Sequence, residues 1–175
     1  MSRGQEGLEI AVKALIVKSL NVEKCLHSTS ISGLNLDLLN STPKQCVSWK
    51  PKGFWYGINY SWVEWCLYNQ SDWLTPFIYE LELGESILKI TDDVEFGLFE
   101  EEYLTIPEGN ISYIDYPKLI NEGYNGLQIS PYRPDKRFSF WYYGWDCASG
   151  CIWNIKGIKS IKLFAEYKND SFVCI

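Results

Sequence analysis

The chain has 175 residues, of which 46% are hydrophobic and 22% charged, so the sequence predicts one folded domain rather than a disordered chain. The net charge of −6, without a dense run of Lys and Arg, argues against broad nucleic-acid binding, which rewards clustered positive charge. No run approaches the roughly 20 apolar residues of a membrane span. The aromatic fraction of 16%, with eight tryptophans, exceeds what general burial explains.

The first segment of the chain combines apolar residues with Lys13 and Lys18. This pattern predicts an amphipathic helix over residues 6–20 rather than a secretion signal, because a signal needs an uninterrupted apolar run. We therefore expect a single domain, residues 1–175, in which an N-terminal helix within residues 1–20 precedes a core over residues 22–167.

Within this core the elements are predicted from hydrophobic periodicity, glycines and capping residues. In chain order they are a strand over 22–30, a strand over 53–57, a helix over 61–69 with Ser61 as N-cap, strands over 77–83 and 86–90, an acidic helix over 92–103, a short helix over 116–124, and strands over 126–130, 138–143, 150–155 and 160–168. Many short strands with a few helices, and no regular βαβ alternation, predict the α+β class.

Six cysteines are present, and no secretion signal is recognised before them. A chain of this length does not need disulfides for stability, so we expect free thiols and a cytoplasmic protein. Cys147 and Cys151 are close in sequence, but no second cysteine or histidine pair completes a zinc set. We therefore expect no metal site.

Short motifs carry the functional information. They are "HST" at 27–29, "GFWYG" at 53–57, "SWVEWC" at 61–66, "EGYNGLQI" at 122–129 and "SGCIWNIKGIKSI" at 149–161. In their order and spacing these motifs resemble those of the ADP-ribosyltransferase superfamily, particularly the branch that includes the poly(ADP-ribose) polymerases. The resemblance implies an ADP-ribosyltransferase-like split two-sheet core that binds NAD as a substrate.

In this family the nicotinamide end of NAD sits in a cleft between two small sheets. The resemblance implies that His27, the single histidine, hydrogen-bonds the ribose of the adenosine half. It also implies that Thr29, or Ser28, contacts the nicotinamide side. On the residues alone, His27 is better read as a half-buried side chain whose ring hydrogen-bonds a neighbour.

The resemblance gives a role to some of the aromatic residues as well. A ring at Trp55 or Tyr56, facing Trp65, would clamp the nicotinamide ring, since aromatic faces attract a flat cationic ring. Ser61 would support the amide end. A second aromatic cluster over residues 138–153 either lines the cleft or packs in the core.

The sequence departs from the family at the catalytic glutamate. Ser149 falls at or near its position, and Gln128 would take the place if "GLQI" were the catalytic strand. Neither side chain carries a charge. We therefore prefer Asp146, three residues before Ser149, as the electrostatic residue, although Asp146 also fits the role of an acid that satisfies a turn.

The function that the resemblance implies is NAD-dependent mono-ADP-ribosyl transfer to an unknown acceptor, with release of nicotinamide. A protein or small-molecule acceptor is favoured over nucleic acid because of the acidic balance. Three alternatives stay open: an NAD glycohydrolase, a catalytically inactive module that binds NAD or ADP-ribose, and an interaction protein whose rings form a partner surface.

Overall fold

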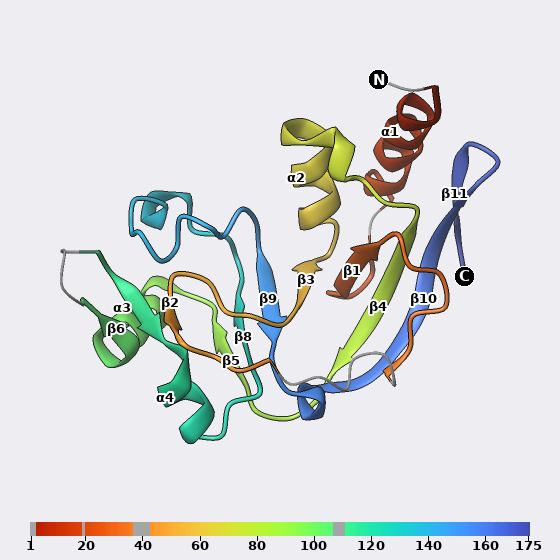
Figure 1. Cartoon of the computed structure of the whole chain (residues 1–175). Coiled ribbons are helices and arrows are strands. Elements are labelled where there is room, and N and C mark those ends of the chain that lie inside the picture. Colours follow the sequence, from red (N-terminus) through yellow and green to blue (C-terminus); the bar gives the residue numbers. More distant parts are fainter. Residues whose placement is uncertain (1–2, 19, 37–42, 107–110) are drawn as a thin grey trace.

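The computed structural model describes residues 3–18, 20–36, 43–106 and 111–175, and it has one large sheet with a few helices (Figure 1). The eight strands of this sheet lie in the order β11 (Ser171–Cys174), β10 (Ile158–Lys168), β4 (Phe77–Leu83), β1 (Cys25–Thr29), β3 (Phe54–Ile58), β9 (Ser149–Ile152), β8 (Gly126–Ile129) and β5 (Ile87–Ile90). Neighbouring strands are antiparallel except β5 and β8, which are parallel. The predicted α+β class is confirmed.

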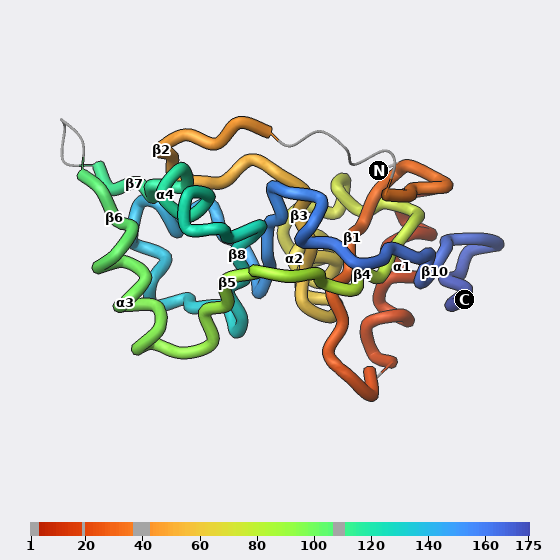
Figure 2. The backbone as a smooth tube through the Cα atoms, turned by 90° about the horizontal axis from the view of Figure 1, so that it is seen from below, coloured from red at the N-terminus to blue at the C-terminus, as the bar shows by residue number. Residues whose placement is uncertain are grey.

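The α-helices are α1 (Arg3–Ile16), α2 (Ser61–Asn69), α3 (Asp93–Tyr103) and α4 (Tyr116–Asn121). Single turns of 3₁₀-helix include η2 (Ser71–Trp73), η3 (Pro134–Lys136) and η4 (Ile155–Gly157). A small sheet has the order β2 (Val47–Ser48), β7 (Tyr113–Asp115) and β6 (Leu104–Thr105). Of these elements, α3, α4 and the small sheet gather beyond the β8 and β5 end of the large sheet, whereas α2 lies beside β3 near its middle (Figure 2). In the described part of the chain, no helix is both long and apolar enough to cross a membrane.

Hydrophobic side chains form two cores on the two halves of the large sheet, and a third cluster around Tyr56, Ile58 and Leu81 joins the halves. One core joins α1 and α2 to β4, β10 and β11. The other joins α3 and α4 to β8 and β5, and it buries the indoles of Trp141, Trp145 and Trp153. Large rings bury the most apolar area per residue, so these tryptophans account for part of the high aromatic content.

The sheet opens into a fork between β1 and β3, where the two halves meet. These two strands pair only at Cys25 with Ile58 and at Leu26 with Gly57. Beyond these pairs β1 continues to pair with β4 through Thr29, while β3 pairs with β9. The strands therefore separate at one end, and each stays bonded to its other neighbour. A pocket lies between them, lined by residues of both strands.

Most predicted elements lie within a few residues of their predicted positions. The strand over 77–83 is observed with the same bounds, as β4. The N-terminal helix ends at Ile16 instead of residue 20, and residues 1, 2 and 19 lie outside the described residues. The strands β2, β6, β7 and β11 were not predicted, because each has only two to four residues.

Two predictions about local structure were wrong. Residues 138–143 form successive turns rather than a strand, with hydrogen bonds such as that from the Tyr142 amide to the Ser139 carbonyl. These turns bury Trp141 and leave Phe138 98% exposed, so the dense aromatic run reflects core packing and not strand alternation. Ser61 is the first residue of α2 and not its N-cap, since Tyr60 occupies the cap position without a side-chain bond.

Candidate functional site

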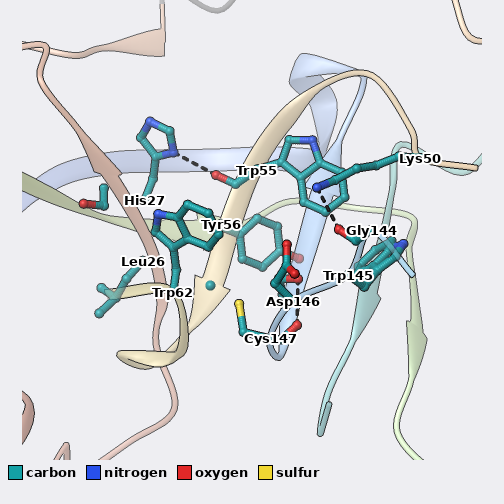
Figure 3. A pocket seen from close by; sticks show the side chains of 13 residues that line it. Leu26, His27, Lys50, Trp55, Tyr56, Trp62, Gly144, Trp145, Asp146 and Cys147 are labelled. Carbon is teal, nitrogen blue, oxygen red and sulfur yellow. Dashed lines mark hydrogen bonds between the residues drawn. The ribbon is translucent and has the colours of Figure 1, made fainter. Parts of the chain in front are cut away.

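A pocket of about 260 Å³ lies in the fork between β1 and β3 (Figure 3). The two strands supply Leu26, His27, Ser28, Trp55, Tyr56 and Gly57. The loop that leads into β9 and the start of that strand supply Gly144, Trp145, Asp146, Cys147 and Ser149. Trp62 from α2 and Lys50 from the segment before β3 complete the lining. The volume is just below the roughly 300–1,000 Å³ of drug-sized sites, so it suits one substituted ring.

The turn between β3 and α2 places Trp62 at this fork. Asn59 adopts a left-handed φ of 54°, which asparagine tolerates better than most residues, and its side chain accepts a hydrogen bond from the Lys24 amide at 2.9 Å. Gly57 lets the helix begin directly over β3, because a Cβ there would lie 3.0 Å from the Cβ of Trp62. The sequence "YGINYSW" therefore turns sharply and projects an indole into the fork.

Two tryptophans, Trp55 and Trp62, contribute rings from different elements. The Trp55 ring packs edge-on against Trp145, with 5.0 Å between ring centroids. The Trp62 ring stacks on Trp65 at 5.3 Å and 11°, and Trp73 joins the same group on the outer side. Trp65 does not line the pocket. Trp62, three residues earlier on the helix, lines the pocket instead, so the structure brings Trp62 and not Trp65 together with Trp55 and Tyr56.

His27 is fixed by a bond across the fork. Its Nδ1 atom lies 2.7 Å from the carbonyl oxygen of Trp55, and a carbonyl only accepts, so Nδ1 carries the hydrogen. The ring also packs on Phe54, with centroids 4.1 Å apart. Burial lowers the pKa of His27 below its ordinary value, although the bond to Trp55 opposes this. The imidazole is therefore neutral near pH 7, with Nε2 as an acceptor.

Ser28 and Thr29, the next two residues of the motif, differ in their placement. Ser28 lines the pocket, and its hydroxyl bonds to that of Thr75 at 2.5 Å. Thr29 lies outside the lining, where its Oγ1 atom accepts from the Ile31 amide at 3.2 Å in the turn after β1. Of the two candidates, Ser28 is the one that the structure brings to the pocket.

Tyr56 and Gln128 form a buried pair beneath the pocket. The Tyr56 hydroxyl donates to Oε1 of Gln128 at 3.1 Å, and Gln128 is only 3% exposed. Burial raises the pKa of the Tyr56 phenol, so the ring stays neutral. Tyr56 lines the pocket, whereas Gln128 does not. The contribution of the Gln128 amide to the site is therefore to orient the Tyr56 ring through this hydrogen bond.

Asp146 is the carboxylate of the pocket, and Figure 3 shows it near Tyr56 and Trp145. No hydrogen bond or ion pair within the described residues engages its oxygens. Burial raises the pKa of Asp146 above its ordinary value, while the positive charges of Lys50 and Arg137 act to lower it. A half-buried acid without a bonded partner is available to a ligand.

The hydroxyl groups of Ser149 and Ser61 form hydrogen bonds to backbone carbonyls close to Asp146. Ser149 lines the pocket, but its hydroxyl donates to the carbonyl of Cys147 at 3.0 Å. The hydroxyl of Ser61 donates to the carbonyl of Ala148 at 2.6 Å and so ties the start of α2 to the strand that follows Asp146. Burial raises the pKa of the Cys147 thiol to about 11, which keeps this pocket residue protonated.

Lys50, Trp62 and Gly144 were not predicted as site residues. A signal existed for Trp62, because it and Trp65 lie three residues apart and share one helix face, so each was an equal candidate. No sequence signal places Lys50 and Gly144 together, since the hydrogen bond between them joins residues 94 positions apart.

Comparisons with protein-family models, with curated proteins and with solved structures found no match to this chain. Among the described residues, no group of three or more His, Cys, Asp or Glu side chains is placed to hold a metal ion. The functional argument therefore depends on the chemistry of the fork pocket itself.

Proposed function

We propose that the fork pocket binds the nicotinamide end of NAD and that the protein is an NAD-dependent mono-ADP-ribosyltransferase with an ADP-ribosyltransferase-like split core. The observation that carries this proposal is the Asp146 carboxylate, which is half-buried among the rings of Trp55, Tyr56 and Trp62 and has no bonded partner among the described residues. The division of the large sheet into two halves at β1 and β3 supports the split core.

The pocket suits a flat ring with a positive charge. Aromatic faces attract cations as well as apolar surface, and the nicotinamide ring of NAD is a pyridinium. A carboxylate in a partly dry pocket favours the same charge more strongly than it would in water. The volume of about 260 Å³ accommodates the ring and its amide, and the rest of the dinucleotide would lead out of the fork from there.

His27 would recognise a ribose hydroxyl. Its Nδ1–H is held by the carbonyl of Trp55, so Nε2 offers a lone pair to a hydroxyl donor. A neutral imidazole suits this role, because it accepts a hydrogen bond without placing a second positive charge beside the cationic ring.

Asp146 would act on the bond between the ribose and nicotinamide. When this bond breaks, its electron pair goes to the ring nitrogen, and nicotinamide leaves as a neutral molecule. The positive charge remains on the sugar, shared between the anomeric carbon and the ring oxygen, where a carboxylate stabilises it. The lone pair of the acceptor then forms the new bond to the anomeric carbon, and the acceptor loses its proton to water.

Incubation of the protein with NAD labelled in the adenosine half and candidate protein acceptors tests this proposal, with nicotinamide release and label transfer followed together. We expect release and transfer, and we expect Asp146→Asn to lower turnover by about a hundredfold with little change in NAD affinity. Release without transfer would identify a glycohydrolase. Binding of NAD without release would identify a binding module, and no binding of NAD would refute the proposal.

A further inference from the structure

Lys50 holds an unusual position at the mouth of the fork. It lies between β2 and β3, and its ammonium nitrogen is 4.4 Å from the centroid of the Trp55 ring. The same nitrogen donates a hydrogen bond to the carbonyl of Gly144 at 2.9 Å. Figure 3 shows Lys50 extending over Trp55 toward Gly144. The lysine therefore covers the aromatic face that a cationic ring would use.

The charge of Lys50 is not neutralised by these contacts, because an aromatic face and a backbone carbonyl are both uncharged. Lys50 acts on the Asp146 carboxylate of the same pocket through its charge, but it forms no ion pair with it or with another acid within the described ranges of the chain. Among the described residues that line the pocket, it is also the one Lys or Arg, and His27 is neutral. A positive charge at a ligand pocket without a bonded acid is free to pair with an anion of the ligand.

A cationic ring and Lys50 would compete for the face of Trp55. Two positive charges on one aromatic face repel each other, so a ligand with a pyridinium ring must displace the ammonium group of Lys50. A lysine side chain moves easily, because its charge sits on a flexible stem of four carbons. The displacement is favourable when the same ligand carries an anion that Lys50 can reach.

We infer that Lys50 is the anion-recognition residue of the fork pocket and that it pairs with the diphosphate of NAD as the nicotinamide ring takes its place on Trp55. This inference rests on the proposed function. It also predicts specificity. The pocket should prefer a ligand that carries both a cationic ring, which stacks on Trp55, and a phosphate group, which reaches Lys50. Lysine binds phosphate as a compact point charge, so one ammonium group is sufficient.

Binding of three probes to four proteins tests this inference. The probes are NAD, ADP-ribose, which has the diphosphate without the cationic ring, and nicotinamide riboside, which has the cationic ring without phosphate. The proteins are the wild type, Lys50→Met, Lys50→Arg and the control Lys52→Met, which makes the same change at an exposed residue outside the pocket. Binding is followed by calorimetry at low and high salt.

We expect Lys50→Met to lower the affinity for NAD and for ADP-ribose by about tenfold. The affinity for nicotinamide riboside should stay unchanged or rise, since one repulsive charge is removed. Lys50→Arg should retain affinity for NAD, Lys52→Met should behave as the wild type, and the loss should shrink at high salt. Lys50→Gln is a second variant if Lys50→Met does not fold.

Two results separate this inference from the proposed function. If the wild type binds NAD and nicotinamide riboside, but Lys50→Met weakens all three probes equally or none of them, the role of Lys50 is overturned while the nicotinamide site stands. If the wild type binds neither NAD nor nicotinamide riboside, the proposed function is overturned, and the role of Lys50 with it.

Discussion

The Nδ1 atom of His27 lies 2.7 Å from the carbonyl oxygen of Trp55, and this bond bridges β1 and β3 where their backbone pairing stops. The ladder between these strands ends at Leu26 and Gly57, so a side chain replaces the next backbone bond. The same bond fixes the tautomer of the ring. The histidine thus links the two strands beyond the end of their ladder, and Nε2 is left as its acceptor.

Removal of the hydrogen-bond acceptor at His27 should weaken the binding of NAD. We expect His27→Ala to cost on the order of 1 kcal/mol in NAD affinity, the usual value of a hydrogen bond whose partner can still reach water. Affinity for free nicotinamide, which lacks ribose, should change less. An equal loss for both ligands, measured by calorimetry, would show that His27 only shapes the fork.

The buried His27 should also make stability sensitive to acid. Its folded pKa is lowered, so the unfolded chain binds the proton first, and stability is lost as pH falls below the unfolded value of about 6.5. Chemical unfolding of the wild type and of His27→Gln at about pH 7 and about pH 5 measures the difference. We expect the wild type to lose more stability over this interval. Equal losses would place the acid sensitivity elsewhere.

The two stacked tryptophans of α2 should differ in function. Trp62 lines the pocket and Trp65 does not, although the rings stack at 5.3 Å. We expect Trp62→Ala to weaken nicotinamide binding by about 1 kcal/mol or more, and Trp65→Ala to have a smaller effect. Melting temperatures of both variants control for the lost stack. A larger effect on binding at Trp65 would contradict the placement of the pocket.

Asp146 should reduce stability at neutral pH. Its folded pKa is raised, so stability from this group is present at low pH and is lost as pH rises through the folded pKa. We expect Asp146→Asn to raise the melting temperature at pH 7 by about 1–2 °C, a small value because water screens a half-exposed carboxylate. The gain should vanish near the ordinary pKa of aspartate, about 3.9. A loss of stability at pH 7 would instead indicate a turn acid that bonds the backbone.

Gly150 in β9 has no room for a side chain. A Cβ at this position would lie 2.4 Å from Cζ of the Tyr56 ring, which is buried and bonded to Gln128. We expect Gly150→Ala to destabilise the protein by about 1–3 kcal/mol and to disturb the pocket through Tyr56. Gly97→Ala in α3, where nothing lies within 4 Å, is the matched control and should stabilise by up to about 1 kcal/mol. Equal denaturation midpoints would contradict the close packing at Tyr56.

The sequence predicted elements well where periodicity and caps agree. The strand Phe77–Leu83 alternates clearly, and α3 begins after Asp92, whose side chain accepts from the Glu95 amide. The prediction of a strand at residues 138–143 was wrong, because a run of aromatic residues is compatible with both a strand and a buried turn. Only the tertiary contacts of Trp141 with Phe96 and Phe99 decide between them.

The candidate site was predictable in part. His27, Ser28 and Trp55, from the motifs of β1 and β3, meet at one fork, together with Asp146 from the distant loop. The contribution of Lys50 was not predictable, since the partner of its ammonium group is a carbonyl in that same loop. Residues brought together by long-range packing leave no local pattern in the sequence.

A crystal structure with bound ligand tests the central claim most directly. The ligand is an NAD analogue in which carbon replaces the ribose ring oxygen, so that the nicotinamide bond is not cleaved. We predict the nicotinamide ring in the fork between Trp55 and Trp62, with the Asp146 carboxylate facing the ring carbon that bears the nicotinamide. An analogue bound outside the fork, or an empty fork at a saturating concentration, would contradict the account.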